Sequence, residues 1–511
     1  MKIVWFLLPI LIQKCSGTIE DDLKLILDHS DSDPSCIFNH TVVTSETIQN
    51  FPKCSKVYGI LVINGNTDLS QTQIKTALKN MSSLVGGVRV ENSTLTSLSF
   101  LTPGAKSKAF SLSCKNYGVY INNNPNLNDG NLLDKIEPFE NEDFNDCDIE
   151  ISGNPLLNLT DLCYSFFLSN LVNLKTGGNL VNCGCQGGEI SASSLSQFQN
   201  CTELYNGLEF QNFTESTVDL SSLSKISYIR GNIDVQNSNL QNLSFLENFK
   251  FSLVYAKEGE AVLNLQNNPQ MTRLGLPVLE NMDNANWITP KLGNIEKLHP
   301  DFCLSLSDFW LFNGIQMTFQ NLEAKLCDEF DEDIDLMCKF VSMEELDEGC
   351  KTIVGNVLIG SGDEEYTEKL SGANCLIGTL TIKNTKLENL MFLNRLAFIA
   401  ALEDTPQPII QIVGNQNLTN PKIGSSFGTI FGRRIENRNA IIQDNHPNIW
   451  NTTNGTCNLF GKTTNEIRDM YQRSLNYTGG DCGERVDAKS NAPLLQKIWT
   501  CFVALLVLSV R

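Results

Sequence analysis

Three segments of this chain repeat one another without a gap, and this self-similarity limits the possible folds more than any other feature. They are GGVRVENSTLTSLSFL at 86–101, GNIDVQNSNLQNLSFL at 231–246 and GTLTIKNTKLENLMFL at 378–393. In each segment an asparagine stands six residues after the first glycine, and leucines follow at nine, twelve and fifteen. In a chain of 511 residues, three such units predict three tandem domains of one architecture.

The pattern inside the unit predicts one turn of a β-solenoid. Apolar residues alternate before the asparagine, as Val88 and Val90 do, which is typical of a short strand with one buried face. The asparagine, which is Asn92, Asn237 or Asn384, marks a corner where its side-chain amide can satisfy backbone groups. The leucines at three-residue spacing then line the interior, as in leucine-rich repeats.

Each copy has further rungs on both sides of this unit. Between 23 and 27 residues upstream lie GILVINGN at Gly59, GLEFQNFT at Gly207 and GNVLIGSG at Gly355. Downstream lie VYINNNPNL, LNLQNNPQM and IQIVGNQNL, which end at Leu127, Met271 and Leu418. A last rung is IEISGNPLL at Ile149 in the first copy and AIIQDNHPNI at Ala440 in the third, and it is less clear in the second copy, near Trp287. We therefore expect an all-β dominated fold with four or five rungs in each copy.

The cysteines recur in step with the rungs. Each copy opens with a close pair and closes with a wider one: Cys36 with Cys54 and Cys163 with Cys183, Cys185 with Cys201 and Cys303 with Cys327, Cys338 with Cys350 and Cys457 with Cys482. Because a solenoid exposes its first and last rungs, disulfides at both ends are a reasonable cap. Cys114 and Cys147 lie in consecutive loops of the first copy and are a further candidate pair. For the remaining Cys375 we favour a buried thiol over an intermolecular link.

Both ends of the chain predict passage through the secretory pathway. Residues 1–17 combine Lys2, an apolar run and small residues, which is typical of a signal peptide. Residues 498–510 are apolar, but they are too few for the roughly 20-residue helix that crosses a bilayer. The segment 493–511 fits the signal that is exchanged for a GPI anchor, with Ser490 as the candidate attachment residue. Free secretion and an unusual tail anchor are the alternatives.

Charge and glycosylation motifs agree with an extracellular protein. Without residues 1–17 and 493–511, the chain has 34 basic and 58 acidic residues, a net charge of −24. Such a surface repels nucleic acid and anionic membranes and favours cationic partners, although acidity can also serve solubility alone. Candidate N-glycosylation sites are Asn39, Asn80, Asn92, Asn158, Asn212, Asn242, Asn417, Asn451, Asn454 and Asn476. An eleventh motif, at Asn200, contains Cys201, which can hinder its use.

Taken together, these motifs resemble the receptor L domain, the ligand-binding repeat of the insulin and EGF receptors. The resemblance rests on the cysteine pairs, the rung with its asparagine and three leucines, and the N-N-P-x-L turns, and it covers residues 36–183, 185–327 and 338–482. It implies three short right-handed β-helices with disulfide-capped ends. The chain departs from the receptors because it has no cysteine-rich module between the copies and no kinase. It is most similar to the stand-alone receptor L-domain proteins of nematodes.

A search for catalytic motifs yields little. His29, His40, His299 and His446 form no metal-ligand spacing, and we expect solvated or structural roles for them. Residues 424–428, GSSFG, fit the letters of a nucleophile elbow, but a solenoid lacks the strand, sharp turn and helix that this elbow needs. The acidic run from Asp328 to Asp335 fails the calcium-loop pattern, because Leu336 stands where glycine is required. We expect no enzyme, no metal and no cofactor.

The leading prediction is therefore an extracellular binding protein that captures a secreted peptide, insulin-like or EGF-like, or pairs with the ectodomain of an L-domain receptor as a co-receptor or decoy. A structural or adhesive glycoprotein of the surface or matrix is the second hypothesis, and a polysaccharide-processing enzyme is the third. Outward-facing strand residues are candidate contacts with a ligand, with ordinary solvated positions as the alternative: Arg89, Glu91, Asp234, Gln236, Thr381 and Lys383.

Overall fold

A computed structural model describes most of the chain. The described residues are 18–28, 32–101, 110–139, 142–214, 218–286, 288–327, 337–403, 408–424, 426–434, 438–451, 455–460 and 475–486. Outside them lie the predicted signal peptide (1–17), the C-terminal signal (493–511), Ser490, Trp287, Asn454, His29 and the acidic run 328–335.

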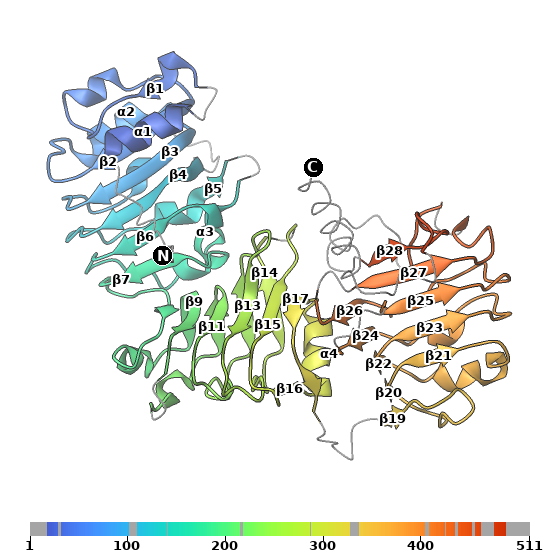
Figure 1. Ribbon diagram of the computed structural model, residues 1–511. Helices are drawn as coiled ribbons and strands as arrows, with labels where there is room; N and C mark the ends of the chain where they lie inside the picture. The colour runs from blue at the N-terminus through green and yellow to red at the C-terminus, as the bar shows by residue number, and fades with distance from the viewer. Residues whose placement is uncertain are drawn as a thin grey trace, which may run out of the picture. The chain divides into compact units, whose positions relative to one another are not determined.

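The described residues fall into two compact units (Figure 1). The first contains the described residues within 1–188, 196–208 and 225–231, and the second contains those within 189–195, 209–224 and 232–511. Parallel β-strands dominate both units. The prediction of a mostly β fold is therefore confirmed.

One seven-stranded sheet of parallel strands forms most of the first repeat. Its strands are β1 (Ile37–Phe38), β2 (Lys56–Ile63), β3 (Ser83–Glu91), β4 (Phe110–Asn122), β5 (Ile136–Pro138), β6 (Ile149–Ser152) and β7 (Leu174–Gly177). The order is β1-β2-β3-β4-β6-β7, and β5 pairs with β4. The helices are α1 (Ile19–Asp28), α2 (Gln71–Leu78) and α3 (Phe166–Ser169).

The strands of the second repeat run from the first unit into the second. They are β8 (Cys185–Glu189), β9 (Glu203–Gln211), β10 (Tyr228–Arg230), β11 (Ile233–Gln236), β12 (Phe251–Val254), β13 (Ala261–Gln266), β14 (Asn281–Asn284), β15 (Leu292–Glu296), β16 (Cys303–Leu304), β17 (Thr318–Leu322) and β18 (Lys325–Leu326). In the first unit β10 pairs with β9, and in the second β11, β13, β15 and β17 pair in turn. Strand β15 is the rung that the sequence left unclear near Trp287.

Two parallel sheets make up the third repeat. The first has β19 (Met337–Lys339), β20 (Thr352–Val354), β22 (Cys375–Ile377), β24 (Phe398–Ala401) and β26 (Thr429–Gly432). The second has β21 (Val357–Ile359), β23 (Leu380–Lys383), β25 (Ile410–Val413), β27 (Asn439–Gln443) and β28 (Asn476–Thr478). The repeated segments of the sequence predicted strands of the second sheet only. The strands of the first sheet were not predicted.

Glycines at the start of the repeated segments stack directly on one another. Gly355 and Gly378 have positive φ angles of 132° and 149°, and each separates a strand of one sheet from a strand of the other. A Cβ atom on Gly378 would lie 2.0 Å from the carbonyl oxygen of Gly355. At Gly86 the same atom would lie 2.1 Å from the oxygen of Gly59. The recurring glycine is therefore required by close backbone stacking between rungs.

The recurring leucines lie inside the repeats, as the sequence predicted. Leu95, Leu98 and Leu101 are buried in the core of the first repeat. The equivalent leucines of the other repeats are also buried, except Leu387, which is partly buried: Leu240, Leu243, Leu246, Leu390 and Leu393.

Buried asparagine amides link successive rungs in a ladder. In the third repeat, Asn415 accepts hydrogen bonds at Oδ1 from Thr385 N (3.0 Å) and Oγ1 (2.7 Å). Its own N and Nδ2 donate to Oδ1 of Asn445 (3.0 and 2.9 Å), and Nδ2 also donates to the carbonyl oxygen of Ile382 (3.0 Å). The same arrangement joins Ser93, Asn124, Asn154 and Asn179 in the first repeat and Ser238 with Asn268 in the second.

The ladder corrects the role predicted for the corner asparagines. Asn92, Asn237 and Asn384 are exposed, and their φ angles of 48°, 52° and 55° place them in the left-handed region. The amides that satisfy buried backbone groups belong instead to the second asparagine of the following turn, such as Asn124. Asparagine tolerates the left-handed conformation better than most residues, which explains its use at the corner.

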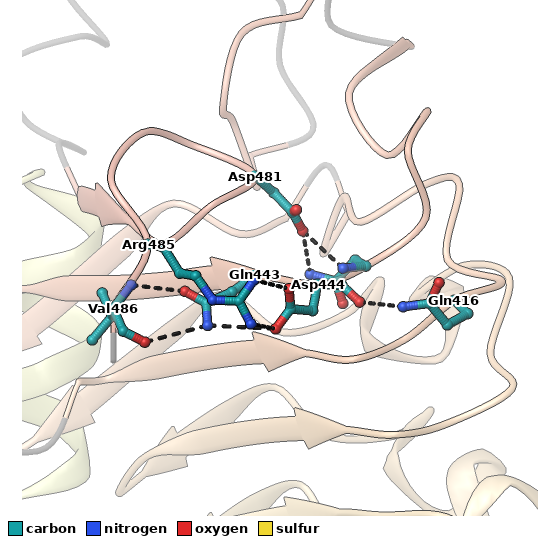
Figure 2. A network of polar contacts seen from close by, with 7 residues as sticks. Gln416, Gln443, Asp444, Asp481, Arg485 and Val486 are labelled. Carbon is teal, nitrogen blue, oxygen red and sulfur yellow. Dashed lines mark hydrogen bonds and ion pairs between the residues drawn. The ribbon is translucent and has the colours of Figure 1, made fainter. Parts of the chain in front are cut away.

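A carboxylate ends the ladder of the third repeat (Figure 2). Oδ2 of Asp481 accepts from N (3.0 Å) and Nδ2 (2.8 Å) of Asn445. Nearby, the Arg485 guanidinium donates to both carboxylate oxygens of Asp444 at 2.8 Å, and Val486 N donates to Gln443 Oε1 at 2.8 Å. Residues 481–486 thus tie the end of the repeat to its last buried rung.

We predict that Asp481→Ala lowers the free energy of unfolding by about 1–3 kcal/mol, because two donors of Asn445 lose their acceptor. Asp481→Asn keeps an amide oxygen in the same place and should cost less than about 1 kcal/mol. Urea unfolding of both variants tests this difference. Equal losses in the two variants would contradict the role of the acceptor.

Seven disulfides stabilise the repeats. They join Cys36–Cys54, Cys114–Cys147, Cys163–Cys183, Cys185–Cys201, Cys303–Cys327, Cys338–Cys350 and Cys457–Cys482. Cys375 lies outside these pairs and is buried, with its sulfur 3.3 Å from Oγ1 of Thr352. Most of the disulfides lie at the opening or closing segment of a repeat.

Aromatic packing joins the second repeat to the third within the second unit. Phe309 of helix α4 (Leu306–Gly314) stacks on Phe398 with ring centroids 6.2 Å apart, and Phe398 contacts Phe431 at 5.5 Å. Arg438, which is buried, donates from Nη2 to the carbonyl oxygen of Phe319 at 3.0 Å. Burial lowers the pKa of this guanidinium to about 10, so it stays charged at neutral pH.

Candidate ligand-binding face

The outward sheet face of the first repeat presents a mixed row of side chains. Strand register places Val62, Arg89, Tyr120, Glu150 and Lys175 side by side on β2, β3, β4, β6 and β7, and we call these residues the outer row. Tyrosine and arginine are enriched among the residues that dominate protein–protein binding energy. Two of the five members, Arg89 and Tyr120, are therefore of the residue types that often anchor a binding partner.

Arg89 and Tyr120 form the centre of the outer row. The Arg89 guanidinium lies 5.3 Å from the centroid of the Tyr120 ring, and its Nε is 3.1 Å from Oε2 of Glu91. The Tyr117 ring meets the Tyr120 ring edge-on, with centroids 5.5 Å apart. Burial raises the pKa of Tyr120 to about 12 and also raises that of Tyr117, so both phenols remain neutral at physiological pH. The face therefore combines aromatic rings, a fixed cation and neutral hydroxyls.

The equivalent face of the second repeat is a closed amide network. Asn264 donates to Asp234 at 2.9 Å, Asn294 donates to Asn264 at 2.8 Å, and Asn321 donates to Asn294 at 2.9 Å. Gln236 also donates to Asp234, at 2.9 Å. These polar groups satisfy one another, so less of their hydrogen-bonding capacity is left for a ligand.

A half-buried glutamate lies beside this network. Burial raises the pKa of Glu209, and the nearby charges of Asp234 and Glu189 raise it further. The second repeat therefore carries a small acidic area on its sheet.

The candidate contact residues of the third repeat are Thr381 and Lys383, and both lie on strand β23. Thr381 pairs in register with Gln411 and is half-buried, whereas Lys383 is exposed. Leu358, beside Thr381 on β21, is 41% exposed. Arg89, Asp234 and Thr381 occupy the same position, three residues after the glycine, and only the first lies over an aromatic ring among the contacts of the described residues.

The three histidines within the described residues make local contacts. His40 packs against the ring of Phe38 at 5.2 Å, His299 Nδ1 accepts from Asp301 N at 3.1 Å, and His446 Nδ1 accepts from Asn448 N at 3.0 Å. Across the described ranges, no three His, Cys, Asp or Glu residues come together in a way that could hold a metal ion. Ser425 of the GSSFG segment lies outside the described residues.

Most of the candidate glycosylation sites lie at the surface. Asn242 is half-buried, and the following asparagines are exposed: Asn39, Asn80, Asn92, Asn158, Asn200, Asn212, Asn417, Asn451 and Asn476. Exposure makes these side chains accessible to modification, and their glycosylation stays a prediction.

The sequence profile of the receptor L domain family matches residues 53–170, 200–307 and 349–454, which is more than half of the chain. This chain belongs to the receptor L domain family. The resemblance that the motifs predicted is thereby confirmed. No curated protein and no solved structure matches the chain.

Family membership indicates the kind of function. Receptor L domains are ligand-binding, non-catalytic modules of receptor-like extracellular proteins, and in receptors they bind peptides such as insulin and EGF. The many disulfides are compatible with an extracellular location. None of the helices described here has the length and apolar character needed to span a membrane.

Proposed function

We propose that this protein captures a secreted peptide outside the cell through the outer row of its first L domain. The observation that supports this proposal is the cluster of Arg89 and Tyr120 on an outward strand face, with Glu91 and Glu150 beside it. An aromatic ring and a guanidinium can anchor a peptide, and the flanking carboxylates can select a cationic one. An insulin-like or EGF-like factor, or the ectodomain of an L-domain receptor, is the class of partner to test.

The wider organisation follows from the same reasoning. We infer that the stacked parallel strands of each L domain wind as a short right-handed β-helix, with domain limits at 36–183, 185–327 and 338–482. Residues 1–17 serve as a signal peptide, and residues 493–511 are exchanged for a GPI anchor at Ser490. A protein held in this way acts as a co-receptor or decoy, because it signals only through a partner.

The test is surface plasmon resonance with residues 18–490, produced with intact disulfides, against secreted insulin-like and EGF-like peptides and L-domain receptor ectodomains. We expect one saturable partner of micromolar affinity or better, about −8 kcal/mol. Arg89→Ala and Tyr120→Ala should each weaken its binding at least tenfold, about 1.4 kcal/mol.

Thr381→Ala is the matched control, because Thr381 occupies the position of Arg89 in the third L domain. Its binding should equal that of the unchanged protein. If no partner binds to the folded, glycosylated protein, peptide capture is wrong and the structural or adhesive hypothesis is favoured.

A further inference from the structure

Helix α1 packs on the outward face of the first L domain, against strand β2 (Figure 1). Leu23 and Ile26, which are 4% and 0% exposed, lie against Ile60 and Val62 of β2. Partly buried Val85 and Tyr117 border this contact. The outward face of the sheet therefore carries an apolar area that an amphipathic helix covers.

Glycines shape the sheet surface beneath this helix. Gly59 and Gly86 pair in register on β2 and β3. A Cβ atom on Gly86 would lie 3.2 Å from Cδ1 of Ile26, so the end of the Ile26 side chain would have to move by a few tenths of an ångström. The missing side chain leaves a shallow place that Ile26 fills. The same absence allows the close stacking of the two strands.

Contacts near its own N-terminus organise α1. Thr18 and Asp21 cap it, since Asp21 N donates to Thr18 Oγ1 at 3.3 Å and Thr18 N donates to Asp21 Oδ2 at 2.9 Å. Acidic residues occupy the first turn and no basic residue occupies the last. A helix of ten residues is marginal when isolated, because such helices need about 12–15 residues. The sheet face therefore stabilises α1, and α1 can unfold when it leaves that face.

Covalent links to the rest of the L domain begin only after α1. The first disulfide of the domain starts at Cys36, eight residues after the helix ends at Asp28. Apart from the chain itself, α1 is thus held by non-covalent contacts, which include the packing of Leu23 and Ile26 and the charge of Asp22 near Tyr117. A competing helix has to replace such contacts but no covalent link.

The area under α1 continues into the candidate binding face. Val62, which α1 contacts, is a member of the outer row and pairs in register with Arg89. Tyr117 packs against α1 on one side and contacts Tyr120 on the other. A ligand that binds the outer row and extends across the sheet would meet α1.

We propose that α1 is an intramolecular competitor for a helix-binding face, and that the partner of this face is a secreted peptide with an amphipathic helix. By analogy with α1, that helix has aliphatic residues at a spacing of three to four. Because the partner has to displace α1 in order to bind, α1 lowers the apparent affinity of the face for the partner. This inference rests on the proposed function, because it names the partner class and the regulation of the same face.

The test uses a fluorescent peptide of residues 18–28 and the full mature chain with a protease site in place of residues 29–31. After cleavage and removal of the released helix, the peptide should bind at least ten times more tightly than it binds the uncleaved chain. A second variant, Leu23→Asp with Ile26→Asp in the full chain, should release α1 without cleavage and give the same increase.

Two altered peptides provide the matched control. A Leu23→Asp peptide should lose binding, whereas a Leu25→Asp peptide should keep it, because Leu25 is 48% exposed on the other side of the helix. Equal binding to cleaved and uncleaved protein, or no binding to either, would overturn the inference. The experiment needs no natural ligand, so this outcome is distinct from a failure of hormone capture in the resonance screen.

Discussion

Replacement of Asn415 by leucine should lower the free energy of unfolding by about 4 kcal/mol or more. The two side chains have similar shape, but leucine leaves Thr385 N, Thr385 Oγ1 and the Ile382 carbonyl without this partner, whereas the backbone N of residue 415 still donates to Asn445. Each buried polar group that loses its hydrogen bond costs about 1–3 kcal/mol. Urea unfolding, followed by circular dichroism, measures the effect.

Asn417→Gln is the control for this substitution. Asn417 lies in the same turn but is exposed, so the change should stay within about 0.5 kcal/mol. Because Asn417 is also a candidate glycosylation site, both variants are compared after enzymatic removal of N-glycans. If Asn415→Leu lowers the free energy of unfolding no more than Asn417→Gln does, the ladder does not stabilise the third L domain.

Gly378→Ala should lower the free energy of unfolding at least as much as Asn415→Leu does. It should also prevent secretion of folded protein. The added Cβ would lie 2.0 Å from the Gly355 oxygen, and the φ angle of 149° is unfavourable for alanine. This clash is relieved only if adjacent rungs separate. We therefore expect the free energy of unfolding to fall by more than about 4 kcal/mol.

Gly177→Ala is a suitable comparison, because a Cβ atom on Gly177 meets nothing within 4 Å. Yield of secreted protein and thermal unfolding should be nearly unchanged for this variant. Normal secretion of Gly378→Ala would show that the rungs can separate at little cost.

The sequence predicted those features that depend on local repetition. Alternating apolar residues such as Val88 and Val90 identified the strands, and the leucines from Leu95 onward lie buried. The recurring glycine was recognised as a marker of the unit, but its steric role is visible only when Gly378 and Gly355 are seen in contact. Close approach of rungs depends on residues 23 apart, which no local pattern measures.

Other features depend on contacts between distant segments and were missed. Strand β15 lacks the corner asparagine of the other rungs, since Lys297 holds that position with a φ angle of 54°. The strands of the first sheet of the third L domain, such as β20 and β22, precede the glycines, and their alternation is too short to read. The corner and ladder asparagines are adjacent in the sequence, as Asn123 and Asn124 are, so spacing could not tell exposed from buried.

The candidate face was predicted only in part. The sequence placed Arg89 and Glu91 on an outward strand face, and the structure leaves both half-buried. The sequence did not indicate their proximity to Tyr120 or to α1, because these partners come from a rung 31 residues away and from a helix that precedes the first disulfide. The amphipathic spacing of Leu23 and Ile26 was the available signal for α1.

The carboxylate of Asp481 gives the amide ladder a direction. Each asparagine donates to the next one along the chain, from Asn415 to Asn445, and the ionised carboxylate at the end accepts but cannot donate. A new rung could therefore be inserted between two asparagines, where every amide would still find a donor and an acceptor, but it could not be added after Asp481. The third L domain can thus be lengthened by duplication of an internal rung, but not by addition of a rung after Asp481.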